Sequence, residues 1–225
     1  MTKVAIIAAH PDDEILGCGG TIAKHVKAGD EVFILILAEG ITSRDKKRNP
    51  ENRTEELSQL KQTARDANKV LGVMSLEICD FPDNRMDSVD RLDVIKVVEE
   101  FIIKHSPSII YTHNFSDINI DHRCVNDAVV VASRPSAESP VKLLLFFETA
   151  SSTEWQMPDR VPGFAPNWWV DISETLDLKM QALDVYQSEM RPWPHPRSNE
   201  AIKHLAHWRG ASISCHAAEA FVLGR

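Results

Sequence analysis

Short apolar runs alternate with longer amphipathic segments along most of the chain. Apolar runs bounded by turn residues are typical of buried strands, whereas apolar residues that recur every three or four positions predict helices. The predicted strands are Val4–Ala9, Val32–Ala38, Leu76–Cys79, Ser108–Thr112, Lys142–Thr149, Trp168–Ile172 and Ala218–Leu223. The predicted helices run from the Asp12–Asp13 pair to about Lys27 and over Glu51–Leu71, Asp87–Lys104, Asp121–Ser133, Ser173–Glu189 and Ser198–Arg209.

The order of these elements predicts the fold class. Four strand–helix units follow one another, which favours an α/β fold with a mostly parallel sheet and helices on both faces. Ser173 and Ser198 stand where they can cap the last two helices. The 225 residues show no internal repeat, low-complexity tract or convincing linker, so we expect a single domain over residues 1–225.

Composition excludes several classes of protein. The chain carries 25 Lys and Arg against 33 Asp and Glu, a formal net charge of −8, which argues against binding to duplex nucleic acid. The four cysteines form no CxxC pair, so we expect reduced and mostly buried thiols. No apolar run is long enough for a transmembrane segment, and we expect a soluble cytoplasmic protein.

Polar side chains collect where the predicted parallel strands end. Ligands of open α/β sheets bind beyond the carboxyl ends of the strands, so the residues that follow each strand are the candidates for chemistry. Imidazoles and carboxylates stand at these places in separate segments: His10, Asp12 and Asp13 after the first strand, Asp83 after the third, and His113, Asp117, Asn119, Asp121 and His122 after the fourth. Such a collection favours a metal-dependent hydrolase.

Three of these residues form a candidate metal site. His10 and Asp13 are three residues apart at a strand–helix junction, and His122 begins the helix after the fourth strand. Two imidazoles and one carboxylate with an open position fit a catalytic Zn²⁺ site, and the same set also admits Fe²⁺, Co²⁺ or Mn²⁺. Asp12 stands beside the ligands and is a candidate general base. The alternative is that Asp12 and Asp13 cap a helix and that His122 is an ordinary surface histidine.

The residues around this site also resemble a known family. The segment Ala8–Glu14 resembles the AHPDDE signature of the PIG-L/LmbE-like zinc N-deacetylases, and Asp121-His122 resembles the end of the family's second motif. The segment Arg53–Glu56 is similar to its Arg-containing helix start. The tail, Pro194–Ser198 and Arg209–Phe221, is similar to the bacterial branch of the family. The resemblance extends over essentially the whole chain.

The resemblance implies a Rossmann-like single domain that hydrolyses the N-acetyl group of an amino sugar or sugar conjugate to acetate and a free amine. It further implies that one zinc ion per chain is bound by His10, Asp13 and His122, and that Asp12 is the general base. Arg53 would help to bind the substrate, and Asp83 would hold sugar hydroxyls. A small N-acetylated molecule is therefore the expected partner, and self-association of the chain is left open.

The second motif departs from the family pattern. The family commonly has His-x-Asp-His, with the first His stabilising the oxyanion, whereas this chain has Asn119-Ile120-Asp121-His122. Asn119 can donate a hydrogen bond but not a proton at neutral pH. The oxyanion could still be held by zinc and the Asn119 amide, and Asp121 is a further catalytic candidate. Three residues remain candidates for protonating the leaving amine: Asp12, His195 and His113. His195 lies in a Pro-rich loop, Arg191–Pro196.

Two other functions are weighed against the deacetylase. A metal-dependent esterase or amidase acting on a non-sugar substrate would use the same ligands. The complete His10–Asp13–His122 set argues against a non-catalytic nucleotide-binding module. The Gly17–Gly20 segment could suggest a dinucleotide turn, but Ile22 stands where the third glycine of GxGxxG should be. We interpret these glycines instead as a surface for close packing of the first helix on the sheet.

Overall fold

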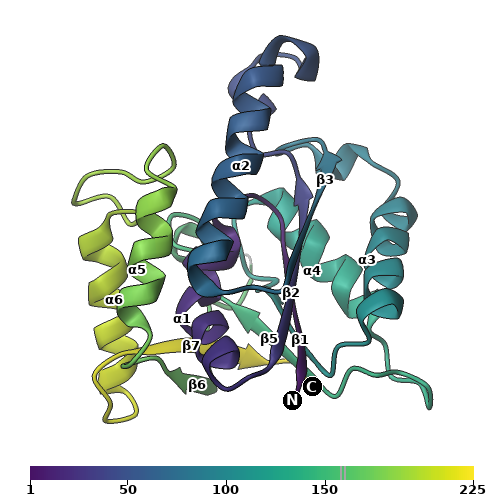
Figure 1. The fold of residues 1–225 in the computed structure, drawn as a ribbon. Coiled ribbons are helices and arrows are strands. Elements are labelled where there is room, and N and C mark those ends of the chain that lie inside the picture. The colour runs from purple at the N-terminus through teal and green to yellow at the C-terminus, as the bar shows by residue number, and fades with distance from the viewer. Residues whose placement is uncertain (158, 160) are drawn as a thin grey trace.

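The computed structural model of the protein describes residues 1–157, 159 and 161–225. Its centre is a seven-stranded sheet in the order β3-β2-β1-β4-β5-β7-β6, in which the first five strands are parallel and β7 is antiparallel to both of its neighbours (Figure 1). The strands are β1 (Lys3–Ala8), β2 (Glu31–Ala38), β3 (Ser75–Phe81), β4 (Ile109–His113), β5 (Leu143–Phe147), β6 (Trp168–Asp171) and β7 (Ala218–Leu223). The expected mostly parallel α/β sheet is confirmed.

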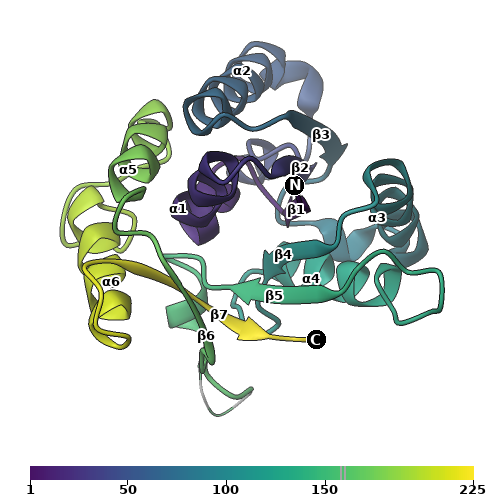
Figure 2. The ribbon, with the colours of Figure 1, turned by 60° about the horizontal axis from the view of Figure 1, so that its bottom comes forward.

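Helices cover both faces of this sheet (Figure 2). One core lies between the sheet and α1, α2, α5 and α6, and the other lies between the sheet and α3 and α4. The helices are α1 (Asp13–Lys27), α2 (Thr54–Leu71), α3 (Arg91–His105), α4 (Ile120–Ala132), α5 (Leu176–Val185) and α6 (Asn199–Ala211). In the part of the chain that the structure describes, none of the helices is long and apolar enough to cross a membrane.

The apolar run of β1 explains the two-sided burial. Successive side chains of a strand point to opposite faces, and Val4 and Ile6 enter one core while Ala5 and Ile7 enter the other. All four are fully buried. A strand that is covered on both faces must be apolar throughout, which confirms the expectation from its sequence.

Three of the predicted helix starts are wrong. The start predicted at Glu51 falls in a 3₁₀ helix, Pro50–Arg53, which leads into α2 at Thr54. The helix predicted from Ser173 begins at Leu176, because the Ser173 hydroxyl donates to the Asp171 carboxylate at 2.6 Å instead of capping. The helix predicted from Asp87 begins at Arg91, where the Asp90 carboxylate accepts the backbone N–H of Leu92. The cap predicted for α6 is confirmed, since the Ser198 hydroxyl accepts the backbone N–H of Ala201 at 3.0 Å.

The glycine-rich segment of α1 is a packing surface. A Cβ at Gly17 would lie 2.3 Å from the Phe147 ring, and one at Gly20 would lie 2.7 Å from the Ile172 side chain. The helix is also kinked at Cys18, where φ is −149° and ψ is 27°. The glycines therefore allow a bent helix to lie directly on the sheet, as expected for close packing rather than for a dinucleotide turn. All four cysteines of the chain are free, but only Cys18 is buried and the other three are partly exposed, so the expectation of mostly buried thiols is wrong.

A buried ion pair satisfies the backbone groups that the kink in α1 leaves open. The Lys179 ammonium donates to the carbonyl of Leu16 at 2.9 Å and to the Glu219 carboxylate at 2.6 Å. Glu219, from the C-terminal strand, also accepts the backbone N–H groups of Gly20 and Thr21. A kinked helix needs such partners, because unpaired buried backbone groups are costly.

We predict that Glu219→Gln destabilises the protein strongly. The substitution leaves the buried Lys179 ammonium without a counter-charge, and loss of one partner of such a pair costs about 3–5 kcal/mol in free energy of unfolding. Glu174→Gln is the matched control, since its pair with Lys27 is largely exposed and an exposed pair contributes no more than about 1 kcal/mol. Denaturant unfolding measures both variants; equal losses would contradict the role assigned to Glu219.

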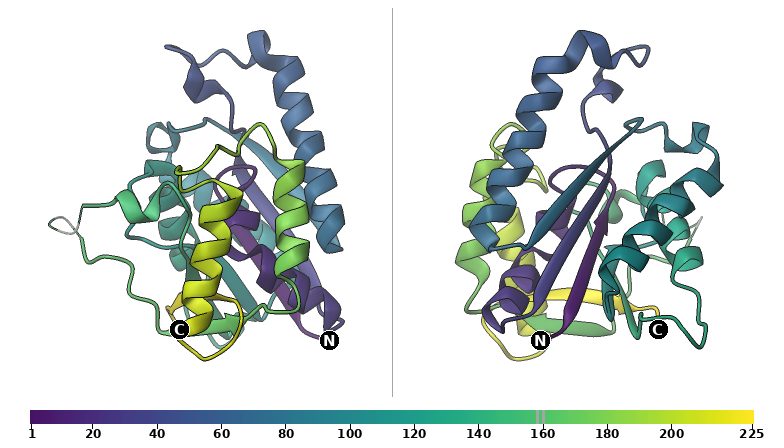
Figure 3. Two further views of the ribbon diagram at one scale, coloured as in Figure 1. Left: turned by 90° about the vertical axis from the view of Figure 1, so that its left-hand side faces the viewer. Right: turned by 45° about the vertical axis from the view of Figure 1, so that its right-hand side comes forward.

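The strand order determines where a ligand site can lie. The direction of strand succession reverses between β1 and β4, and α/β sheets bind ligands in the crevice at such a reversal, beyond the carboxyl ends of the strands. Both chain termini lie at the opposite end of the sheet (Figure 1). The start of α2 and the segment before it project beyond the carboxyl ends (Figure 3).

Candidate metal centre

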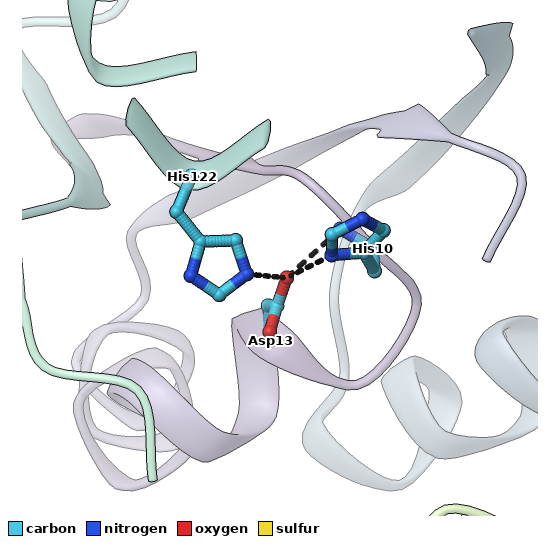
Figure 4. Close-up of side chains that lie close together, drawn as sticks. All are labelled: His10, Asp13 and His122. Carbon is cyan, nitrogen blue, oxygen red and sulfur yellow. Dashed lines mark hydrogen bonds and ion pairs between the residues drawn. The ribbon is translucent and has the colours of Figure 1, made fainter. Parts of the chain in front are cut away.

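His10, Asp13 and His122 converge at the reversal point of the sheet (Figure 4). His10 lies just after β1, Asp13 is the first residue of α1, and His122 lies in the first turn of α4. The Asp13 Oδ2 atom is 3.1 Å from His10 Nδ1 and 3.2 Å from His122 Nε2. One ligand atom from each side chain lies within 4.8 Å of the other two, so the three residues can bind one ion.

Unpaired buried atoms indicate that this cluster fits a cation. Asp13 Oδ1 is buried without a hydrogen-bond partner among the described residues, and the buried His122 Nε2 has only its 3.2 Å ion-pair contact with Asp13 Oδ2. Buried polar atoms are rarely left in that condition, and an ion is one of the partners that accounts for them. Two imidazoles and a carboxylate are the donor set of catalytic zinc sites, and they also suit other divalent transition metals.

Each histidine of the cluster has a carboxylate behind it. His122 Nδ1 lies 3.1 Å from Asp117 Oδ2, and His10 Nε2 lies 3.0 Å from Asp121 Oδ2. Such carboxylates fix the orientation and tautomer of a ligating imidazole and raise its basicity. In each ring the other nitrogen is thereby directed toward Asp13.

The two supporting carboxylates are themselves held by many donors. Asp117 accepts from the hydroxyls of Ser152 and Thr153, the latter at 2.8 Å, and from the backbone N–H of Asn119. Asp121 accepts the backbone N–H groups of Asn84 at 2.6 Å and Met86 at 2.9 Å. The sequence placed Asp117 at this edge without a role, and no motif pointed to Ser152 or Thr153.

Charge interactions within the cluster outweigh the effects of burial. Burial acts to raise the pKa of Asp13, but His122 and His113 hold it well below its usual range. Burial acts to lower the pKa of His122, but Asp13 and Asp117 raise it to about 9. A metal binds the neutral imidazole, so it must displace a proton from His122, and metal affinity falls as the pH is lowered.

We predict that Asp117→Asn weakens metal binding about 10–100-fold, the usual effect of losing such a supporting carboxylate. All three candidate ligands remain in this variant. Asp127→Asn is the matched control, because Asp127 lies exposed on α4, the helix that carries His122, 3.8 Å from Arg91. Competition for Zn²⁺ against a chelator measures the affinities. Equal affinity of the two variants would show that Asp117 does not support His122.

Asp12 is held beside the cluster in an unusual backbone conformation. Its φ is 111° and ψ is −31°, and its side chain makes no capping hydrogen bond to α1. The carboxylate pairs instead with Arg197, with Nη1 2.7 Å from Oδ2. Burial raises the pKa of Asp12 to about 8, although Arg197 acts in the opposite direction. The interpretation of Asp12 as a helix cap is therefore wrong.

The residues expected to bind substrate lie in different surroundings. Asp83 is buried with Oδ1 3.3 Å from His10 Nε2, and its Oδ2 accepts the backbone N–H of Ser43. The Arg53 guanidinium forms ion pairs with Asp45 and Glu56. It lines a separate cavity of about 440 Å³ beside α2. The fold thus brings Asp83 to the cluster, whereas the bonds of Arg53 go to carboxylates elsewhere.

Asn119 occupies the N-cap of α4. Its side-chain oxygen accepts the backbone N–H of Asp121 at 2.8 Å, and its amide nitrogen donates to the Asn84 side chain at 3.0 Å. The side chain is thus engaged in fixing the turn that holds Asp121. This local role differs from the expected one of facing an oxyanion.

The two other histidines considered as proton donors have distinct surroundings. His113 is buried and stacks on His122 at 3.9 Å between ring centroids. Its Nε2 accepts the backbone N–H of Ala9, and its Nδ1 lies 3.2 Å from the Thr149 hydroxyl. Burial and His122 hold the pKa of His113 well below its usual range, so the ring is neutral and fully engaged. The Nδ1 atom of His195 accepts the backbone N–H of Arg197 at 3.1 Å.

Comparison with known proteins places this geometry in a family. The family model described as PIG-L, GlcNAc-PI de-N-acetylase, matches residues 5–133, more than half of the chain and including every residue of the metal cluster. The chain is 27% identical over 202 residues to the diacetylchitobiose deacetylase of Thermococcus kodakarensis, covering 83% of this chain and 70% of that protein.

Two further likenesses agree with this match. The chain is 27% identical over 190 residues to a probable N-acetyl-alpha-D-glucosaminyl L-malate deacetylase 2 of Bacillus cereus, with 83% of each chain covered. The crystal structure of a conserved protein from Thermus thermophilus superposes with a TM-score of 0.76 at 25% sequence identity, covering 100% of this chain and 96% of that one.

Proposed function

The chain belongs to the PIG-L family and is a hydrolytic N-deacetylase, and from this premise we propose that it removes the acetyl group of a small N-acetylated amino sugar or sugar conjugate with one bound Zn²⁺ ion. The observation that supports the proposal is the convergence of His10, Asp13 and His122, in which Asp13 Oδ2 lies 3.1 Å from His10 Nδ1 and 3.2 Å from His122 Nε2. The relatives named above, which are a deacetylase of diacetylchitobiose and a probable one of a glucosaminyl malate, support an amino-sugar substrate.

The roles of the chain's own residues follow from their positions. His10, Asp13 and His122 would hold the metal, which when bound supplies a Lewis acid for the amide carbonyl and lowers the pKa of a water molecule. Asp12, beside the cluster, takes the proton of the attacking water. The water oxygen forms a bond to the acetyl carbon, and the C–N bond then breaks to give acetate and an amine.

The same carboxyl group then returns the proton to the leaving nitrogen. Burial raises the pKa of Asp12 above that of an exposed carboxyl group, so Asp12 holds the proton more readily until it is transferred. His113 is unsuited to this step because both of its ring nitrogens are engaged. His195 is the second candidate, since its loop also carries the partner of Asp12. Asp83 lies near enough to His10 to accept a hydrogen bond from a sugar hydroxyl beside the cluster.

We predict that the wild-type protein releases acetate from at least one sugar of a panel that holds N-acetylglucosamine, N,N′-diacetylchitobiose and N-acetylglucosaminyl malate. Asp12→Asn should lower kcat about 10²–10⁴-fold, the usual contribution of a general base. Asp12→Asn should keep its metal, because Asp12 is not a ligand. Enzymatic assay of acetate and elemental analysis of each protein provide the measurements.

Asp127→Asn, an exposed substitution on α4, is the control for nonspecific effects on the panel. Acyl esters are tested in parallel, because faster ester hydrolysis with no acetate from any sugar would favour the esterase alternative. Turnover by Asp12→Asn close to that of the control would contradict the assignment of the base.

A further inference from the structure

The backbone of Asp12 is fixed by its immediate neighbours. A φ of 111° is rare for a residue with a side chain and needs support from the surrounding structure. The N–H of Asp12 donates to the Glu14 carboxylate at 3.0 Å. Its carbonyl accepts the N–H groups of Ile15 and Leu16 at 3.1 and 2.9 Å. These bonds position the Cα of Asp12 but leave the direction of its carboxylate to be determined by other groups.

A distant arginine determines that direction. Arg197 Nη1 donates to Asp12 Oδ2 at 2.7 Å, across 185 positions of sequence. In the same guanidinium, Nε donates to the Ser151 hydroxyl at 2.7 Å. The group therefore joins the start of α1 to the segment after β5, and its own backbone precedes Ser198, the cap of α6.

Only an arginine matches this geometry among the cationic side chains. Its planar guanidinium presents donors in a rigid fork, so one group can bond to Ser151 and Asp12 at once in a fixed orientation. A lysine ammonium in this place would keep the charge but lose the orientation. Asp12 is 2% exposed and the Arg197 side chain is 23% exposed, so water screens this pair weakly.

We propose that Arg197 is a positioning residue for the deacetylation: anchored on Ser151, it binds Oδ2 of Asp12 and so directs Oδ1 toward the reacting water. The inference rests on the proposed function, since it assumes that Asp12 is the general base. It assigns a task to the Pro-rich loop before α6, which holds Arg197 against Asp12. The alternative is that Arg197 merely fastens this loop to the body of the protein.

The test compares Arg197→Ala with Arg191→Ala in the full-length, metal-loaded protein. Arg191 lies in the same loop, and its guanidinium donates to the carbonyls of Ser188 and Met190, so it is a matched control. With the panel sugar that the wild type hydrolyses fastest, Arg197→Ala should lose about 10–100-fold in kcat, the scale expected for a misplaced catalytic group. KM and metal content should stay near the values of the control.

Chemical rescue separates positioning from fastening. Free guanidinium ion, at concentrations that leave the protein folded, should restore part of the kcat of Arg197→Ala but none of that of Asp12→Asn. Sodium ion at the same ionic strength should restore neither. A crystal structure of Arg197→Ala should show the Asp12 carboxylate rotated while the backbone at Asp12 is unchanged. The proposal is overturned if Arg197→Ala has the same kcat as Arg191→Ala. It is also overturned if Arg197→Ala loses kcat, guanidinium does not restore it, and the Asp12 carboxylate has not moved.

Two conservative variants cover the case in which Arg197→Ala fails to fold. Arg197→Lys keeps the positive charge but not the two fixed donors, and Ser151→Ala keeps the guanidinium but removes the hydroxyl that anchors it. Both variants should therefore lower kcat with little change in KM. Normal kcat in both variants overturns the proposal. Failure of the proposed function is distinguishable, because then Asp12→Asn itself retains turnover or the wild type releases no acetate.

Discussion

The pairing of β1 with β4 is the constraint on which the site depends. The two strands are parallel neighbours in a fixed register, with Ile7 opposite Thr112, so the residues that follow them emerge at the same edge of the sheet. His10 follows one strand, and the loop after the other leads to His122. A slip of this register by one residue would reverse which face each side chain enters, and both faces are buried. The two apolar cores therefore maintain the geometry of a polar site.

The Asp13 carboxylate organises the polar groups at this edge. It lies within 3.5 Å of a ring nitrogen of His10, His113 and His122, and carboxylates behind His10 and His122 hold those rings in place. Apart from His10, which is partly exposed, these groups are buried, where charges interact strongly and water cannot substitute for a lost partner. A metal ion that binds here would therefore have to displace protons from the cluster.

Much of this structure could be predicted from sequence, because it depends on local signals. The apolar run of β1 and the turn after it predict a buried strand that ends just before His10, and the element order places His122 at the start of the helix that follows β4. The cap predicted at Ser173 is wrong, because a capping residue competes with other partners that only the fold supplies; Ser173 bonds to Asp171 instead. Arg197 could not be assigned a partner, because its contact with Asp12 spans 185 positions and depends on how two loops meet.

The central claim is that His10, Asp13 and His122 bind one divalent metal ion. Anomalous diffraction from zinc-loaded crystals, recorded above and below the zinc absorption edge, tests it directly. The account predicts an anomalous peak within bonding distance of these three side chains. A peak between His10, Asp83 and Asp121, the other acidic group that could hold an ion, or no peak at either place, would contradict the claim.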